Sequence, residues 1–116
     1  MQHMITDKFG DVVLVPFPFT DQSTSKKRPA IVISSDLYNQ CKPDLILIAV
    51  TSQVNKNLEL GEVLINDWYA AGLLKLSAIK PVITTVEQNL VIKILGKLES
   101  SDIQALQDVL QQIITI

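Results

Sequence analysis

Two short apolar segments joined by a long proline-containing loop constrain the fold of this chain more than any other feature. Residues 12–15 (VVLV) and 30–33 (AIVI) are apolar, rich in β-branched side chains and bounded by turn-forming residues, as short strands are. Pro16 and Pro18 have no backbone N–H, so the first strand cannot continue regularly through them. Residues 21–25 are polar and would gain nothing from burial. The sequence therefore predicts two strands connected by one long loop.

The predicted loop ends in the densest group of positive charges in the sequence, Lys26, Lys27 and Arg28. The proline that follows favours an extended backbone at Arg28, at the foot of the second strand. A fixed guanidinium beside a loop that carries Phe17 and Phe19 is suited to bind a phosphate and stacked bases. The alternative interpretations are a solvated charge at a strand edge for Arg28, a solvated basic face for the lysines, and core packing for the phenylalanines.

A run of six apolar residues, 45–50, indicates a strand that is covered on both faces. At its exit the chain would present Thr51, Ser52 and Gln53. For Thr51 the alternative interpretation is an ordinary strand-end hydroxyl that bonds to the backbone. Shorter strands are predicted at residues 62–65, 74–78, 83–86 and 90–95, with Pro81 limiting the strand that precedes it. Residues 34–43 are predicted to be a connection, and residues 66–72 a turn that ends at Gly72.

The last part of the sequence predicts an amphipathic helix. Ser100 or Ser101 can cap it, with Asp102 in its first turn. Apolar residues recur at helical spacing at positions 103, 106, 110 and 113, and positions 109 and 114 widen the stripe. We expect this helix to lie across a sheet. Many short strands with one terminal helix indicate a mainly β protein, built as a small closed or half-closed barrel.

Length and composition suit a single domain over residues 1–116, with residues 1–9 peripheral: 47% of the side chains are hydrophobic, enough for a core. The single cysteine, Cys41, excludes an intrachain disulfide and indicates a reducing compartment, and we expect a small buried or partly buried thiol. Without a signal-peptide pattern or an apolar run near the roughly 20 residues of a membrane helix, the chain is predicted to be soluble and cytoplasmic, with no membrane partner.

Several chemistries have no suitable residues in this sequence. Its only histidine is His3, so a paired-histidine ribonuclease mechanism cannot be built within one chain. A Ser/His/Asp triad is not expected because this histidine falls in the peripheral N-terminal segment. It has no Cys/His cluster, HExxH motif, Walker loop or dinucleotide fingerprint, so neither a metal site nor a cofactor is expected. A net charge of −2 argues against a general nucleic-acid binder, but not against an enzyme with local positive charge. What remains is Arg28 with Thr51 and Ser52.

The chain resembles the MazF/PemK family of toxin endoribonucleases. The resemblance rests on GDVVLV at residues 10–15 and KRPAIVIS at residues 27–34. It continues with VTSQ at residues 50–53, LLKLSAIK at residues 73–80, and GKL at residues 96–98 before the helix. The PFPF sequence of the loop differs from that of the best-known members.

The resemblance implies an SH3-like barrel of the MazF/CcdB type with a C-terminal α-helix, assembled as a homodimer. It implies the toxin of a type II toxin–antitoxin system that cleaves single-stranded mRNA at specific sequences without a metal, leaving a 2′,3′-cyclic phosphate and a 5′-hydroxyl. Its protein partner would be an antitoxin whose disordered acidic tail occupies the RNA groove. Arg28 and Thr51 would be the catalytic pair. The candidate substrate contacts are Phe17, Phe19, Lys26, Lys27, Ser52, Gln53 and Lys80.

Two other functions stay open. One is a non-enzymatic poison of the CcdB type, which binds a topoisomerase; the presence of both Arg28 and Thr51 argues against it. The other is a plain SH3-like module, which would offer an aromatic-lined groove to proline-rich peptides. With 5% aromatic residues the chain is poorly supplied for such a groove.

Overall fold

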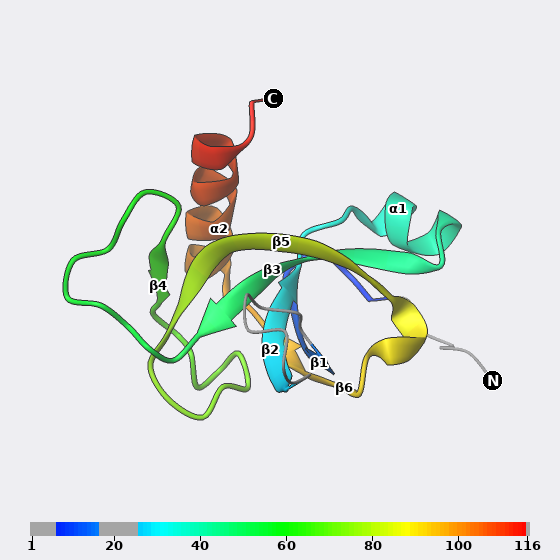
Figure 1. Ribbon diagram of the computed structural model, residues 1–116, viewed down its shortest axis with the longest axis horizontal. Helices are drawn as coiled ribbons and strands as arrows, with labels where there is room; N and C mark the ends of the chain where they lie inside the picture. The colour runs from blue at the N-terminus through cyan, green and yellow to red at the C-terminus, as the bar shows by residue number, and fades with distance from the viewer. Residues whose placement is uncertain (1–6, 17–25, 116) are drawn as a thin grey trace.

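The computed structural model describes residues 7–16 and 26–115, and within them six strands form one antiparallel sheet in the order β4-β5-β3-β2-β1-β6. The sheet curls into a half-barrel, with β5 running along β3 and the C-terminal helix standing against one side (Figure 1). The mainly β prediction with a terminal helix is therefore confirmed. The elements are β1 (Asp11–Pro16), β2 (Lys27–Val32), α1 (Asp36–Cys41), β3 (Asp44–Thr51), β4 (Val63–Ile65), β5 (Ser77–Glu87), the 3₁₀ turn η1 (Gln88–Leu90), β6 (Lys93–Lys97) and α2 (Ser100–Ile113).

Alternate side chains of the central strands pack into two separate cores, one on each face of the sheet. The core beneath α2 contains Ile31, Ile48 and Val50 with Leu106 of the helix, and we call this side the helix face. The other core lies on what we call the second face. Its buried residues are Val13, Val15, Ala30, Val32, Leu45, Leu47, Ala49 and Val86.

Strand β3 is the strand that the sequence predicted to be covered on both faces, and this prediction is confirmed. Leu47 and Ala49 are buried in the second core, while Ile48 and Val50 are buried in the helix-face core. Because a slip of one residue would exchange the two sets of side chains, this double burial fixes the register of β3 against its neighbours.

Strand β2 begins at Lys27, two residues before Pro29, so the prediction of loop as far as Pro29 is wrong. Towards β1 the ladder continues to the pair of Lys27 with Pro16. Towards β3, among the described residues, it begins at the pair of Ala30 with Ala49. Pro29 has no N–H to donate, which is why the β2–β3 ladder stops beside it.

Strand β5 runs unbroken through Pro81, so the prediction that this proline limits a strand is wrong. Between Ile48 and Ala49 the register against β3 shifts: Ile48 pairs with Ile83 and Ala49 with Lys80. Two extra residues, Pro81 and Val82, form a bulge that accommodates the missing N–H. The strand predicted at residues 74–78 starts only at Ser77, and Leu74 is 95% exposed.

Helix α1 lies within residues 34–43, which were predicted to be a connection. The Ser35 hydroxyl accepts a hydrogen bond from the Tyr38 N–H and caps it. Desolvation, the negative charge of Asp44 and a hydrogen bond to that carboxylate raise the pKa of the Tyr38 hydroxyl above its ordinary value. Cys41 is exposed at the end of α1, so the expectation of a buried thiol is wrong.

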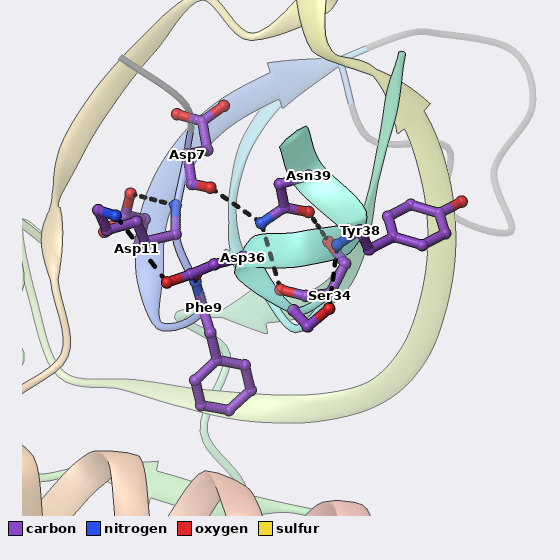
Figure 2. A network of polar contacts seen from close by, with 9 residues as sticks. Asp7, Phe9, Asp11, Ser34, Asp36, Tyr38 and Asn39 are labelled. Carbon is purple, nitrogen blue, oxygen red and sulfur yellow. Dashed lines mark hydrogen bonds and ion pairs between the residues drawn. The ribbon is translucent and has the colours of Figure 1, made fainter. Parts of the chain in front are cut away.

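A network of polar contacts ties the first described residues to α1 (Figure 2). Asn39 is buried and donates from Nδ2 to the carbonyls of Asp7 and Ser34, at 2.9 and 3.2 Å. The Ser34 hydroxyl donates to Asn39 Oδ1 and accepts from the Ile46 N–H. Asp7 is itself buried, so residues 7–9 are held more firmly than the expected peripheral segment. His3 lies outside the described residues.

The start of α2 differs from the expected serine cap. Glu99 occupies the N-cap position and its side chain makes no capping hydrogen bond. Asp102, in the first turn, is buried and accepts hydrogen bonds from the backbone N–H groups of Asn66 and Asp67, both at 2.9 Å. This carboxylate therefore joins the helix to the turn over residues 66–72. That turn ends, as predicted, at Gly72, whose φ is +86°.

Replacing Asp102 with Asn is expected to lower the free energy of unfolding by about 1–3 kcal/mol. The amide keeps the size of the side chain but turns an NH₂ group towards one of the two backbone donors. Urea denaturation measures the change. The matched control is Asp108→Asn on the exposed side of the same helix. Equal stability of the two variants would contradict the structural role of Asp102.

Candidate active site

Arg28 and Thr51 lie on neighbouring strands, at the same end of the sheet and on the same face. The β2–β3 ladder ends at the pair of Ala30 with Ala49. Continued two residues further along each strand, its register sets Arg28 opposite Thr51. Residues two apart on a strand point to one face, so both side chains share the second face with these alanines. On the other side Arg28 pairs with Val15, which is buried in the second core. Both Arg28 and Thr51 are half-buried, at the edge of that core.

The hydroxyl of Thr51 accepts a hydrogen bond from the Gln53 N–H, at 3.1 Å. A threonine oxygen has two lone pairs and one O–H, so this bond uses a lone pair and leaves the hydroxyl hydrogen to donate elsewhere. An anion such as a phosphate oxygen is a suitable acceptor. Ser52 and Gln53 are exposed and follow the end of β3, beyond the residues whose orientation the sheet fixes.

Lys80 approaches the same place from β5. It pairs with Ala49, and residues directly opposite in a ladder lie on one face, so Lys80 also belongs to the second face. It is exposed, whereas Val82, two residues further along the same face of β5, packs against the second core. Three adjacent strands therefore bring Arg28, Thr51 and Lys80 to one end of the second face.

The structure separates the other candidate residues from this group. Lys27 pairs with Pro16 and, by strand alternation, belongs to the helix face rather than to the face of Arg28. Lys26 is exposed just before β2. Phe17 and Phe19 lie outside the described residues.

The arrangement favours an anion. Arg28 and Lys80 are cations, and among the described strand residues Asp11 is the carboxylate on the second face, at the far end of β1. A guanidinium and a hydroxyl together offer directed donors to a phosphate. Within residues 7–16 and 26–115, no three His, Cys, Asp or Glu side chains gather as metal ligands would. No helix in this described part is long and apolar enough to cross a membrane.

Sequence reasoning missed how small the side chains beside this group are. Ala49 and Ala30 lie beside Lys80 across the sheet, and Ala78 pairs with Thr51. All three are buried and end in a methyl group. Their signal in the sequence was weak because alanine is common in any strand or helix. The two-residue shift at Pro81, which decides where Ala78 and Lys80 lie, has no simple sequence pattern.

Residues 8–114 match the family model described as the PemK-like, MazF-like toxin of type II toxin–antitoxin systems. The chain belongs to the PemK/MazF toxin family. No curated protein sequence gave a significant match.

Solved structures of MazF proteins share this fold. MazF from Deinococcus radiodurans is 18% identical and superposes with a TM-score of 0.74 over 97% of this chain and 99% of that one. The MazE–MazF complex from the same organism gives 16% identity and a TM-score of 0.73, covering 97% and 98%. A mycobacterial endoribonuclease in complex with its cognate antitoxin gives 14% identity, a TM-score of 0.70 and 90% coverage of both chains. At these identities the likeness establishes the fold of this PemK/MazF toxin.

Replacing Thr51 with Val is expected to lower the free energy of unfolding by about 1 kcal/mol or less, because the hydrogen bond that it removes is exposed. Valine keeps the β-branched shape that suits the end of a strand. Urea denaturation beside the wild type checks this. A loss as large as that of Asp102→Asn would mean that Thr51 has a mainly structural role.

Proposed function

We propose that this PemK/MazF toxin is an endoribonuclease that cleaves single-stranded mRNA at specific sequences, without a metal ion or cofactor. The observation that carries the proposal is the register of β2 against β3, which sets Arg28 across from Thr51 on one face. Membership of the toxin family and the fold shared with a mycobacterial endoribonuclease support it.

The proposed reaction is a transesterification in which RNA supplies its own nucleophile. The substrate 2′-oxygen loses its proton and forms a bond to the adjacent phosphorus, and the bond from phosphorus to the 5′-oxygen breaks. The 5′-oxygen takes up a proton, so the products are a 2′,3′-cyclic phosphate and a 5′-hydroxyl. Negative charge builds up on the phosphate oxygens in the transition state, which is where directed donors contribute most.

In this mechanism Arg28 binds the scissile phosphate and stabilises that charge with two directed N–H donors. Thr51 donates its hydroxyl hydrogen to the same phosphate, held by the bond from the Gln53 N–H. The guanidinium offers N–H donors and no acceptor, so Arg28 acts in this mechanism as a fixed positive charge. Ser52 and Gln53, exposed after β3, contact the neighbouring nucleotides.

The proposed partners are a cognate antitoxin and a second copy of the chain. Solved relatives include a MazE–MazF complex and an endoribonuclease bound to its antitoxin, which support the first. Large apolar side chains that are strongly exposed, among them Leu60, Tyr69 and Leu74, leave apolar surface for a homodimer interface. An acidic segment of the antitoxin would compete with RNA for Arg28.

Replacing Arg28 with Ala, or Thr51 with Val, is expected to reduce cleavage of single-stranded RNA about 100-fold or more, the usual loss when one donor to a transition-state oxyanion is removed. The assay uses purified protein, a long RNA and EDTA, and sequencing of the 5′ ends maps the cleavage motif. The control is Lys75→Ala, an exposed lysine outside the strands, which should cleave as the wild type does.

Loss of cleavage on addition of EDTA would contradict the metal-independent mechanism, and an unchanged rate for Arg28→Ala would contradict the assigned role of Arg28. Intact RNA together with inhibited DNA supercoiling would instead favour a topoisomerase poison.

A further inference from the structure

We infer that Lys80 binds an RNA phosphate next to the scissile one, and so sets substrate affinity rather than the rate of the chemical step. The inference rests on the proposed function, because it assigns a further contact to the same site. It follows from where β5 places this lysine relative to Arg28 and Thr51.

Lys80 is one row away from the catalytic pair. We call residues that lie opposite one another on adjacent strands a row. Arg28 and Thr51 share one row, whereas Lys80 shares the next row, two residues along the strands, with Ala30 and Ala49. Thr51 is thus its diagonal neighbour, at a typical separation of about 7–8 Å, which long side chains can span. A phosphate held between Arg28 and Thr51 lies in the first row, so the ammonium of Lys80 is better placed for the next phosphate of the strand.

The bulge in β5 produces this displacement. With the register of Ile48 and Ile83 continued, Lys80 would pair with Thr51; the two extra residues, Pro81 and Val82, move it to Ala49. Ala78 takes the place beside Thr51 instead. The methyl group of Ala78 therefore lies next to the hydroxyl of Thr51, and the ammonium of Lys80 lies one row further along the sheet.

The surroundings of Lys80 suit a phosphate contact. It is exposed, and towards β3 it faces the alanines 49 and 30. On its other side the β4–β5 register, continued by one residue, sets Glu62 opposite it, and the carboxylate of Glu62 accepts a hydrogen bond from the Glu59 N–H. Asp11, on the same face, is at the opposite end of β1. An ammonium is a compact point charge, so a contact of this kind needs charge rather than a fixed hydrogen-bond geometry.

The test compares Lys80→Met, which keeps the aliphatic stem and removes the charge, with Lys75→Met as the matched control. The probe for binding is a fluorescent RNA oligonucleotide that carries the mapped motif, or a mixed single-stranded sequence, with a 2′-deoxy nucleotide at each position where cleavage occurs. Anisotropy at several salt concentrations gives affinity and its salt dependence. Lys80→Met is expected to bind about 3- to 10-fold more weakly at 0.1 M salt, with the slope of log K against log salt reduced by about 0.7, the value for one phosphate of a single strand.

In cleavage assays the Lys80→Met variant should raise KM by a similar factor and leave kcat within about two-fold, whereas Arg28→Ala lowers kcat. Lys80→Arg should restore affinity. Binding by Lys80→Met that equals binding by Lys75→Met would overturn the inference, even where cleavage persists. A fall in kcat like that of Arg28→Ala would assign Lys80 to the scissile phosphate instead. Failure of the wild type to cleave any RNA contradicts the proposed function, while the binding comparison still decides whether Lys80 contacts a phosphate.

Discussion

The register between β2 and β3 is the constraint on which the rest of the structure depends. Both strands bury side chains on both faces: Ile31 and Ile48 on the helix face, Ala30 and Ala49 on the second face. Sliding either strand by one residue would drive each set into the wrong core, and sliding it by two would leave large side chains opposite small ones. The position of Arg28 opposite Thr51 is therefore a consequence of packing several residues away. The two cores thus fix the strands that carry Arg28 and Thr51, the pair proposed to be catalytic.

Two prolines interrupt the regular pairing of β3 with its neighbours near Arg28 and Thr51, because each proline lacks a backbone N–H donor. Pro29 stops the β2–β3 ladder next to Ala30, so the strands are no longer joined by backbone hydrogen bonds where Arg28 and Thr51 lie. Pro81 is accommodated in a two-residue bulge, which changes the β3–β5 register at Ala49. The end of the sheet proposed to be functional is thus the end at which regular pairing is interrupted on both sides of β3. Polar side chains there can turn towards a ligand, while the paired parts of the same strands remain rigid.

The sequence predicted the elements whose signal is local. The apolar run at residues 45–50 and the heptad-like stripe of α2 are patterns of burial that any compact fold must satisfy, and both are present. The proline rule failed at Pro81, because a bulge accommodates the missing donor, whereas the extended backbone expected at Arg28 before Pro29 is present. Helix α1 was missed since its stability comes from Asn39 and Ser34, whose partners are distant in sequence. For the candidate site, residue types identified Arg28 and Thr51. Only the strand register showed that Lys80 lies on the same face as Arg28 and that Lys27 lies on the opposite face.

With a net charge of −2, the proposed binding of RNA would depend on local rather than global electrostatics. The carboxylate of Asp11, on the second face, is four residues along β1 from the row of Arg28, a distance of roughly 13 Å at about 3.3 Å per residue. This exceeds the Debye length of about 8 Å at physiological ionic strength, so Asp11 contributes little to the field where Arg28 and Lys80 lie. Long-range attraction contributes little, and most of the discrimination must come from contacts made after encounter. Such a surface would suit the proposed activity, the cleavage of short sequences within a large excess of RNA, because weak non-specific binding would let the protein leave unsuitable sites.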